Sequence, residues 1–197
     1  MNRIINNDNS CRREKRVPPG QYSTRKFPVM TAGRVPKIVQ DDWKLQIFGL
    51  VEKKSDFGWQ EIMSMEAETV IADFHCVTQW TRLNNVWRGL KFNALMELVK
   101  PKPEARYVMI HCYGGYTTNL ALDVLKDGDV LFAHHLDGSP LESDRGGPLR
   151  LVVPKRYGWK SAKWVNGLEF KSEDSPGFWE SRGYHMDGDP LKEQRLS

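Results

Sequence analysis

The sequence predicts a mixed α+β fold built as one domain. Three observations lead to this: short apolar or β-branched runs recur along the chain, only a few short segments show helical spacing, and no repeat of fixed length is present. The chain has 197 residues, and single domains typically contain roughly 100–200. Hydrophobic residues make up 40% and charged residues 27%, as in ordinary globular proteins. We therefore expect one folded core.

The N-terminal part is predicted to differ from the rest. Residues 1–26 are polar and contain the turn-forming Pro18-Pro19-Gly20, which is typical of a flexible or surface-draped arm. The short basic run at 12–16 is expected to be a solvated part of this arm. The domain itself is expected at 27–197, without a second domain.

Hydrophobic periodicity places the elements of the domain in order. Alternating or β-branched apolar runs predict strands, whereas apolar residues three or four positions apart predict helices. The second helix has a clear end, because Pro101 disfavours the helical conformation in the residue before it. Turns such as Gly114-Gly115 and Asp137-Gly138 separate the later strands. The expected strands are 43–50, 69–76, 107–112, 117–122, 130–135, 149–154 and 163–171, and the expected helices are 59–65 and 92–100.

Charge and hydropathy argue against a nucleic-acid partner and against a membrane span. The formal net charge is only +4 and basic residues are interspersed with acidic ones, so no nucleic-acid partner is expected. No stretch approaches the ~18 consecutive apolar residues of a membrane span, and residues 1–20 lack the apolar core of a secretory signal. We expect a cytoplasmic protein without a membrane span.

The cysteines indicate neither a disulfide framework nor a structural zinc site. Cys11, Cys76 and Cys112 are odd in number and show no C-x-x-C spacing. His75 beside Cys76 and His111 beside Cys112 raise the question of zinc. Both pairs fall in expected strands, where neighbouring side chains point to opposite faces. One member of each pair would therefore face away from a shared metal.

The first candidate group surrounds Cys76, at the end of the strand expected at 69–76. A thiolate is the ligand that soft metal ions prefer in proteins, and strand ends often present reactive groups. A small buried hydrophobic cysteine is the alternative interpretation. Trp80 and Trp87 follow closely in the sequence, and each is expected either to line a substrate funnel or to pack in the core.

The second candidate group runs from Arg145 to Trp164. Several cations lie close together there, glycines allow backbone N–H groups to approach an oxyanion, and Ser161 offers a hydroxyl donor. This composition predicts a phosphate cradle. It is not a Walker loop, since G-x-x-x-x-G-K-[ST] is absent. A basic surface hairpin is the alternative.

Together these motifs closely resemble the molybdopterin domain of the sulfite oxidase-like family. The resemblance rests on C-V-x-x-W-[ST] at Cys76, D-G-x-P-L at 137–141 and G-G-P-L-R-L-V-V-P-x-x-Y-G-x-K-S-x-K-W at 146–164. It extends over about residues 27–184 and covers sulfite oxidase, plant nitrate reductase and the periplasmic methionine sulfoxide reductase catalytic subunit. It implies a sulfite oxidase-like molybdopterin-binding fold and an oxidoreductase that uses molybdenum and molybdopterin.

The resemblance also implies a set of site residues. Cys76 would be the single protein ligand of molybdenum and a catalytic residue. The pterin phosphate would be held by a group that shares the second motif: Arg145, Arg150, Ser161, Ala162 and Lys163. Arg145 stands where relatives have histidine or asparagine.

Two further positions are implied by the resemblance. Tyr116 resembles the active-site tyrosine of sulfite oxidase, whose phenol can hydrogen-bond an oxo ligand or the substrate. His111, or Cys112 beside it, falls near a position that contacts the pterin.

The sequence departs from the sulfite oxidase pattern at two places. The stretch at 27–36 lacks the arginine, asparagine and histidine of F-x-x-R-N-H-x-x-V-P, and Trp80 replaces the arginine of C-x-x-N-R after Cys76. The pocket thus looks more like the sulfoxide reductase type. Arg82 and Arg88 lie close enough in sequence to restore a cation.

We expect two-electron oxygen-atom transfer, preferably the reduction of a small-molecule S-oxide or N-oxide with electrons from an unidentified partner. Sulfite oxidation and a non-catalytic cofactor-binding protein of the same fold are the alternatives. A hydrolase using Cys76 and His75 is disfavoured, because adjacent strand residues do not readily form a nucleophile–base pair.

Overall fold

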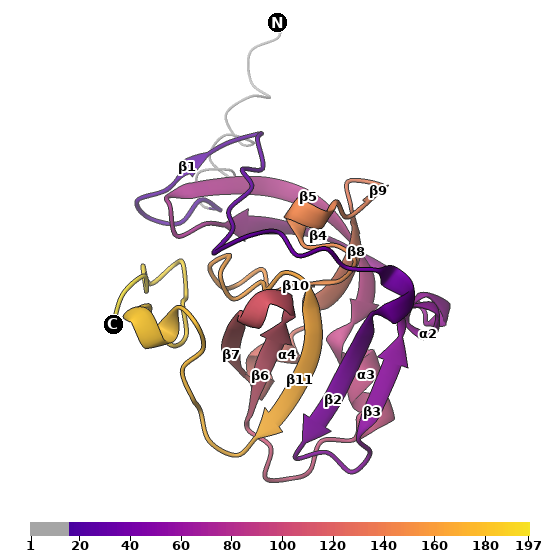
Figure 1. Ribbon diagram of the computed structural model, residues 1–197. Helices are drawn as coiled ribbons and strands as arrows, with labels where there is room; N and C mark the ends of the chain where they lie inside the picture. Colours follow the sequence, from indigo (N-terminus) through magenta and orange to yellow (C-terminus); the bar gives the residue numbers. More distant parts are fainter. Residues whose placement is uncertain (1–15) are drawn as a thin grey trace, which may run out of the picture.

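The computed structural model describes residues 16–197, which form two mixed β-sheets with short helices at their edges (Figure 1). The expected α+β class is confirmed. The strands are β1 (Tyr22–Ser23), β2 (Lys44–Gly49), β3 (Ser55–Gly58), β4 (Glu68–His75), β5 (Trp80–Lys91), β6 (Tyr107–Cys112), β7 (Thr117–Ala121), β8 (Leu131–Leu136), β9 (Ser139–Pro140), β10 (Arg150–Val152) and β11 (Val165–Lys171). The helices are α2 (Trp59–Ser64), α3 (Phe92–Val99) and α4 (Leu122–Leu125), with 3-10 turns η1 (Gln40–Asp42), η2 (Tyr113–Gly115), η3 (Ser143–Arg145) and η4 (Glu180–Arg182).

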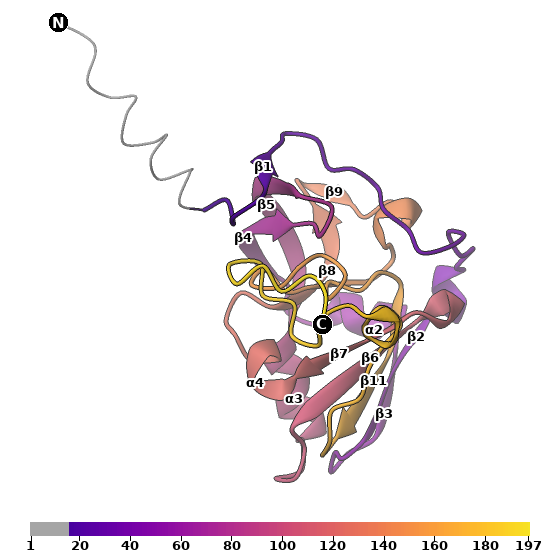
Figure 2. The same cartoon turned by 90° about the vertical axis from the view of Figure 1, so that its left-hand side faces the viewer.

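The first sheet is organised around the long strand β5. It has the order β1-β5-β8-β10, with β4 paired along β5 and β9 paired to β8. The second sheet has the order β3-β2-β11-β6-β7, in which β2 and β11 are parallel and the other pairs are antiparallel. Both views show the β4–β5 pair lying over one end of the second sheet (Figures 1 and 2).

Two hydrophobic clusters stabilise this arrangement. The larger one joins the second sheet to α3 and α4 through side chains such as Phe92, Leu95 and Leu122. The smaller one fills the space beneath the β4–β5 pair and contains Cys76, Trp80 and six other buried residues. The functional candidates lie where the smaller cluster ends. None of the described helices is long and apolar enough to cross a bilayer.

The expected elements are confirmed, with bounds that differ by a few residues. The strand expected at 163–171 starts only at Val165, because Trp164 has a positive φ of 56° that extended strands do not contain. The strand expected at 149–154 is the short β10. β5, at twelve residues, is the largest element that the sequence did not indicate.

The described part of the N-terminal arm lies against the domain. β1 pairs in parallel with the start of β5, and the Arg16 guanidinium lies 2.5 Å from the Asp73 carboxylate. Gln21 Nε2 donates to the carbonyl of Cys76 at 3.1 Å. Residues 16–26 are therefore draped on the surface, which is one of the two forms expected for the arm. Cys11 and the basic residues at 12–15 lie outside the described residues.

Candidate cofactor and substrate cavity

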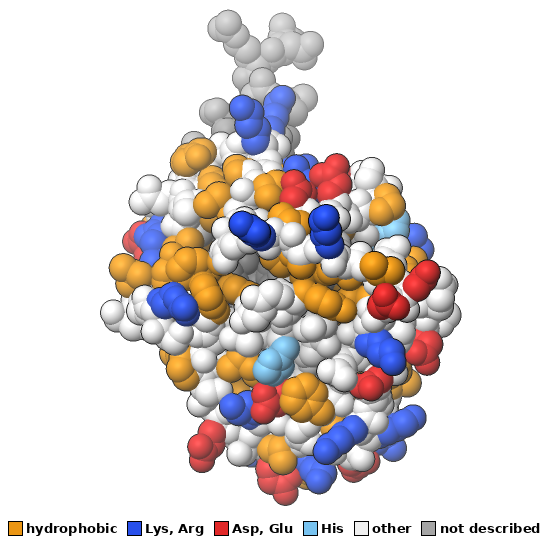
Figure 3. All heavy atoms as spheres, viewed as in Figure 1, with side chains coloured by type: hydrophobic (Ala, Val, Ile, Leu, Met, Phe, Trp, Pro, Cys, Tyr) orange, Lys and Arg blue, Asp and Glu red, His pale blue; other side chains and the backbone are white. Residues whose placement is uncertain are grey.

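A cavity of about 570 Å³ lies below the β4–β5 pair, within the size range of small-molecule and cofactor sites. The face drawn in Figure 3 is hollowed there, with hydrophobic side chains around the hollow. Segments far apart in the sequence line it: the extended stretch 27–34, the end of β4 with the start of β5, the η2 turn and its neighbour Tyr116, parts of 145–164, and Trp179 with Tyr184.

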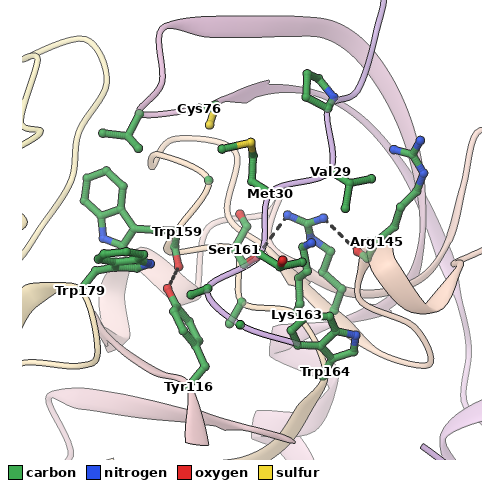
Figure 4. A pocket seen from close by; sticks show the side chains of 18 of the residues that line it. Val29, Met30, Cys76, Tyr116, Arg145, Trp159, Ser161, Lys163, Trp164 and Trp179 are labelled. Carbon is green, nitrogen blue, oxygen red and sulfur yellow. Dashed lines mark hydrogen bonds between the residues drawn. The ribbon is translucent and has the colours of Figure 1, made fainter. Parts of the chain in front are cut away.

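Cys76 follows β4 and presents its sulfur to this cavity (Figure 4). A tight reversal follows it, in which Gln79 N–H donates to the carbonyl of Cys76 and Cys76 N–H donates to the carbonyl of Trp80. Gln79 adopts a positive φ of 71° to close the turn. The Sγ atom lies 3.1 Å from the Thr78 hydroxyl oxygen. The turn therefore fixes the thiol at the cavity wall, as a metal ligand requires.

Arg150 is the most deeply buried cation of the cavity, with 3% of its surface exposed. Its Nη1 donates to the carbonyl of Arg145 at 3.0 Å and its Nη2 to the carbonyl of Ser161 at 3.3 Å; Figure 4 marks these bonds with dashed lines that end at the labelled Arg145 and Ser161. The guanidinium carbon lies 4.9 Å from the ring centroid of Phe74. Its Nε is buried without a hydrogen-bond partner among residues 16–197. This buried donor therefore lacks an acceptor, and an acceptor atom of a ligand would supply the missing partner.

Arg145 and Lys163 add two more cations on the same side. Arg145 Nη1 donates to the carbonyl of Phe27 at 3.0 Å, and Lys163 Nζ donates to the carbonyl of Asp144 at 2.6 Å. The carboxylate of Glu142 reaches Arg145 at 3.3 Å but is largely exposed, so the contact neutralises little. The three cations donate to neutral carbonyl oxygens, which do not cancel a positive charge.

The pKa values of Lys163 and Arg150 are both lowered, by burial and by the neighbouring positive charges. The pKa of Lys163 is lowered to about 7, first by burial and then by the charge of Arg150, while Asp144 opposes the change. The pKa of Arg150 is lowered to about 10, by burial first and by Arg145 second, while Cys76 opposes the change. An anion bound between these side chains would remove the repulsion. The cluster would therefore be stabilised by a bound anion.

Ser161 and Ala162 complete the cradle. The Ser161 Oγ accepts a hydrogen bond from Val153 N–H at 3.0 Å, which leaves its O–H able to donate to a ligand. Ala162 lines the cavity between Ser161 and Lys163, and its carbonyl accepts from Leu151 N–H. The predicted phosphate-binding residues are thus brought together.

Aromatic side chains line another side of the cavity, and most of them were not predicted. Trp159, Trp179 and Tyr184 join Tyr116 there. The Tyr116 hydroxyl donates to the carbonyl of Trp159 at 2.6 Å, and burial, followed by Glu180, raises the pKa of Tyr116 well above 10. Tyr116 therefore lines the cavity as expected. Because its hydroxyl proton is donated to the carbonyl of Trp159, the hydroxyl oxygen can only accept a hydrogen bond from a ligand.

Residues 32–179 match the family described as the oxidoreductase molybdopterin binding domain. The chain belongs to this family. Among its relatives, the uncharacterized oxidoreductase YuiH of Bacillus subtilis is 43% identical over 183 residues, which is 92% of each chain. The protein-methionine-sulfoxide reductase catalytic subunit MsrP of Campylobacter jejuni is 30% identical over 163 residues, 71% of this chain and 52% of that protein.

A solved structure confirms the sulfite oxidase-like fold. The sulfane dehydrogenase SoxCD from Paracoccus pantotrophus superposes with a TM-score of 0.66 at 19% identity, covering 88% of this chain and 56% of the other. At that identity the likeness bears on the fold alone. Family membership makes this chain a molybdopterin-dependent oxidoreductase and confirms molybdenum with molybdopterin as its cofactor.

The residues of the cavity fit the cofactor of the molybdopterin-binding family. The unpartnered Nε of Arg150 and the cation cluster suit a phosphate, and Cys76 supplies the soft thiolate that molybdenum takes. The stretch 27–34, which lacks the family's arginine, asparagine and histidine, nevertheless forms one wall of the cavity. The assignment of individual roles remains a prediction.

His111 is not brought to the cavity. Its Nε2 lies 3.0 Å from the Glu169 carboxylate and its ring 5.7 Å from that of Phe48, on the outer face of the second sheet. Side chains alternate along β6, so Cys112 points into the larger core cluster instead. The predicted pterin contact of His111 or Cys112 is not supported by this geometry. Tyr113 and Gly114, which follow them, line the cavity.

Three further expectations near Cys76 are decided by the geometry. Arg82 is held by Asp137 at 2.5 Å, Arg88 is exposed, and neither lines the cavity. These arginines therefore do not replace the missing cation. Trp80 lines the cavity, whereas Trp87 is fully buried in the smaller core cluster.

Proposed function

We propose that this protein reduces a neutral S-oxide or N-oxide to the sulfide or amine. One observation carries the proposal: at the turn that follows the predicted metal ligand, Trp80 lines the cavity and neither nearby arginine does. A dianion such as sulfite is costly to desolvate without fixed cations. A neutral oxide needs only an apolar pocket and a hydrogen-bond donor for its oxygen.

Trp80 supplies such a donor. Its Nε1 is buried and has no partner among the described residues, and an oxide oxygen is an acceptor that such a group can take. The ring packs 5.8 Å from Phe74 and 5.5 Å from Phe27, centroid to centroid, which holds it in place. Trp80 would thereby orient the oxygen that leaves the substrate.

The remaining roles follow the geometry of the cavity. Arg145, Arg150, Ser161 and Lys163 would hold the pterin phosphate and Cys76 would bind molybdenum. When bound, the cofactor supplies the two-electron redox chemistry. Each turnover consumes two electrons from a donor and two protons, and converts the oxide to its reduced form and water. The aromatic and apolar walls would limit the access of other water.

Steady-state assays with a dye-reduced enzyme test this proposal. We expect reduction of S-oxides or N-oxides and slow or absent sulfite oxidation. Trp80→Phe keeps the ring but removes the donor and should lower kcat/KM for the oxide by about 2- to 12-fold, as expected for one hydrogen bond. Trp87→Phe is the matched control, because its Nε1 is also buried and unpartnered but does not line the cavity. Efficient sulfite oxidation without reduction of any oxide would contradict the proposal.

We also propose that the protein works in a reducing compartment, the cytoplasm, with a separate electron-transfer partner. What supports this is that the two cysteines in the described part of the chain, Cys76 and Cys112, are both free thiols. Cell fractionation with an antibody against the chain tests the compartment. Recovery of the chain outside the cytoplasm would contradict it.

A further inference from the structure

The aromatic wall of the cavity consists of Trp159, Trp179 and Tyr184. Tyr184 packs edge-on against Trp159, with centroids 5.1 Å apart, and lies 4.8 Å from Trp179. None of the three belongs to either hydrophobic core cluster. Trp179 and Tyr184 are only partly buried although they line the cavity. Their rings therefore retain surface that a ligand can cover.

This wall lies away from the phosphate cradle. Figure 4 shows Trp159 and Trp179 on one side of the cavity and Arg145 and Lys163 on the other, with Cys76 at the edge between them. A cofactor held by the cradle residues and by Cys76 would occupy the cationic side of the cavity. The aromatic wall would then remain for the substituents of the substrate.

A buried polar network holds the wall in place. Glu180 follows Trp179 directly, and its Oε1 lies 2.6 Å from Lys160 Nζ, with both side chains fully buried. The same oxygen accepts from Trp159 Nε1 and Thr118 Oγ1, each at 3.0 Å. Lys160 Nζ also donates to the side chain of Asn119 at 2.8 Å. The indoles on either side of this pair therefore cannot move freely, and a preformed aromatic surface favours a flat partner.

We infer that the substrate is an aryl oxide, in which the sulfur or nitrogen that carries the oxygen is attached to or part of an aromatic ring. The inference rests on the proposed oxide reduction and names its substrate class. The ring stacks or packs edge-on against Trp179 and Tyr184, and the oxide group points to Cys76 and Trp80. An alkyl oxide of the same size would fill the same part of the cavity but would not make aromatic contacts with Trp179 and Tyr184.

Two sulfoxides of similar size test the inference on the molybdenum-loaded enzyme. Methyl phenyl sulfoxide offers a flat ring, and methyl cyclohexyl sulfoxide offers similar apolar bulk without one. An aromatic pair contributes beyond its buried area, so kcat/KM should favour the phenyl compound by about 2- to 12-fold. The dissociation constant, measured by calorimetry on the oxidised enzyme, should show the same preference.

Two variants separate the aromatic wall from bulk hydrophobicity. Trp179→Leu should reduce the phenyl-to-cyclohexyl ratio to about one, in binding and in turnover, and Trp179→Phe should restore part of it. Trp59→Leu, which removes a Trp of α2 that does not line the cavity, should keep the wild-type ratio. Equal use of both compounds by the wild-type enzyme, or an unchanged ratio in Trp179→Leu, would overturn the inference.

The outcomes distinguish this inference from the proposed function. If the enzyme reduces both sulfoxides equally well, oxide reduction stands and the aryl preference is wrong. If it reduces neither sulfoxide but binds the phenyl compound more tightly in a Trp179-dependent way, the aromatic wall recognises an aryl ligand and oxide reduction is wrong. If it neither binds nor reduces either compound, both are wrong.

Discussion

Arg145, Arg150 and Lys163 place three positive charges in one wall, and the carboxylates of Glu142 and Asp144 offset only part of them. Such a cluster costs folding free energy in the absence of its ligand, because each charge is desolvated and repelled by the others. A bound anion would offset this cost. Binding sites commonly retain such local destabilisation, which the ligand then offsets.

The lowered pKa of Lys163 makes this cost depend on pH in the cofactor-free protein. Below pH 7 Lys163 is charged in both folded and unfolded chains, and the full cost of burying the charge is present. Between about 7 and 10.5 the folded protein binds fewer protons than the unfolded chain, so stability rises with pH in this window. Lys163→Met should raise Tm most at pH 6.5, and its advantage should shrink towards pH 10.

Thermal unfolding of the wild-type protein and of Lys163→Met, measured between pH 6.5 and 10 in phosphate-free buffers, checks this pH dependence. Lys155→Met is the control, because Lys155 is exposed and hydrogen-bonds Asp127, which raises its pKa. That variant should show no gain at pH 6.5. A Tm difference for Lys163→Met that stays constant with pH would rule out the titration of Lys163 as its cause.

Cys76 and Cys112 allow a direct comparison of two buried thiols. Cys76→Ser should keep the fold but lose molybdenum and redox activity, because an alkoxide is a poorer ligand than a thiolate for this metal. Cys112→Ser should keep the metal, since Cys112 lies in the core and burial raises the pKa of its thiol. Elemental analysis of the purified variants is the measurement. Retention of molybdenum in Cys76→Ser and its loss in Cys112→Ser would show that the wrong cysteine was chosen.

The elements that the sequence predicted are those with a clean local pattern. β2, β6 and α3 each carry a single periodicity and a recognisable end. β5 was missed because polar residues such as Arg82, Asn84 and Asn85 interrupt its pattern. They are accommodated in other ways: Asn84 adopts a positive φ of 55°, and Asn85 is buried and donates to the carbonyl of Ala72 at 3.0 Å. These contacts depend on β4 and are not visible in the sequence of β5 alone.

The Lys160–Glu180 pair connects the loop after β10 to the η4 turn and should be important for stability. Removing one partner leaves an uncompensated buried charge, so Glu180→Ala should lower the free energy of unfolding by ~3–5 kcal/mol. The double variant Lys160→Met with Glu180→Leu should lose less, because no charge remains buried. Urea unfolding at constant m-value measures both.

An exposed ion pair provides the comparison. Lys155 and Asp127 lie 2.9 Å apart, with 59% and 39% of their side chains exposed, and Lys155→Ala should change stability by less than about 1 kcal/mol. If Glu180→Ala proves as mild as Lys155→Ala, the buried pair does not hold the η4 turn in the way that we describe.

At the scale of the whole molecule, the cavity combines segments that only the fold brings together. The cradle could be predicted because its residues share one continuous motif at 145–164. The positions of Trp179 and Tyr184 could not be predicted, because no helix or strand was expected in that part of the sequence. The contacts of Glu180 with Lys160 and Trp159, which hold this segment at the cavity, are formed only in the folded chain. The pterin contact predicted for His111 or Cys112 is not matched by the cavity lining, which begins just beyond the end of β6 with Tyr113 and Gly114.

Cofactor binding should stabilise the whole protein, because the ligand binds the folded state only. Arg150→Ala removes charge-assisted contacts and should weaken retention roughly 10- to 160-fold, the equivalent of one such bond at ~1.5–3 kcal/mol. Native mass spectrometry of pterin content, together with the Tm gain on loading, measures this. Arg106→Ala, at an exposed position outside the cavity, should retain the wild-type gain; an equal loss there would indicate a general charge effect.

The wall at 27–34 has a kinetic consequence. It belongs to no helix or strand, and it is tied to the domain by β1 before it, by η1 after it and by the Arg145 contact to the Phe27 carbonyl. Displacing it breaks few backbone hydrogen bonds, so the cavity can be filled after both sheets have formed. We therefore expect that the cofactor can be loaded into the folded domain by displacing residues 27–34. The lifetime of the holoenzyme would be set by how often this cover lifts, and not by how often the domain unfolds.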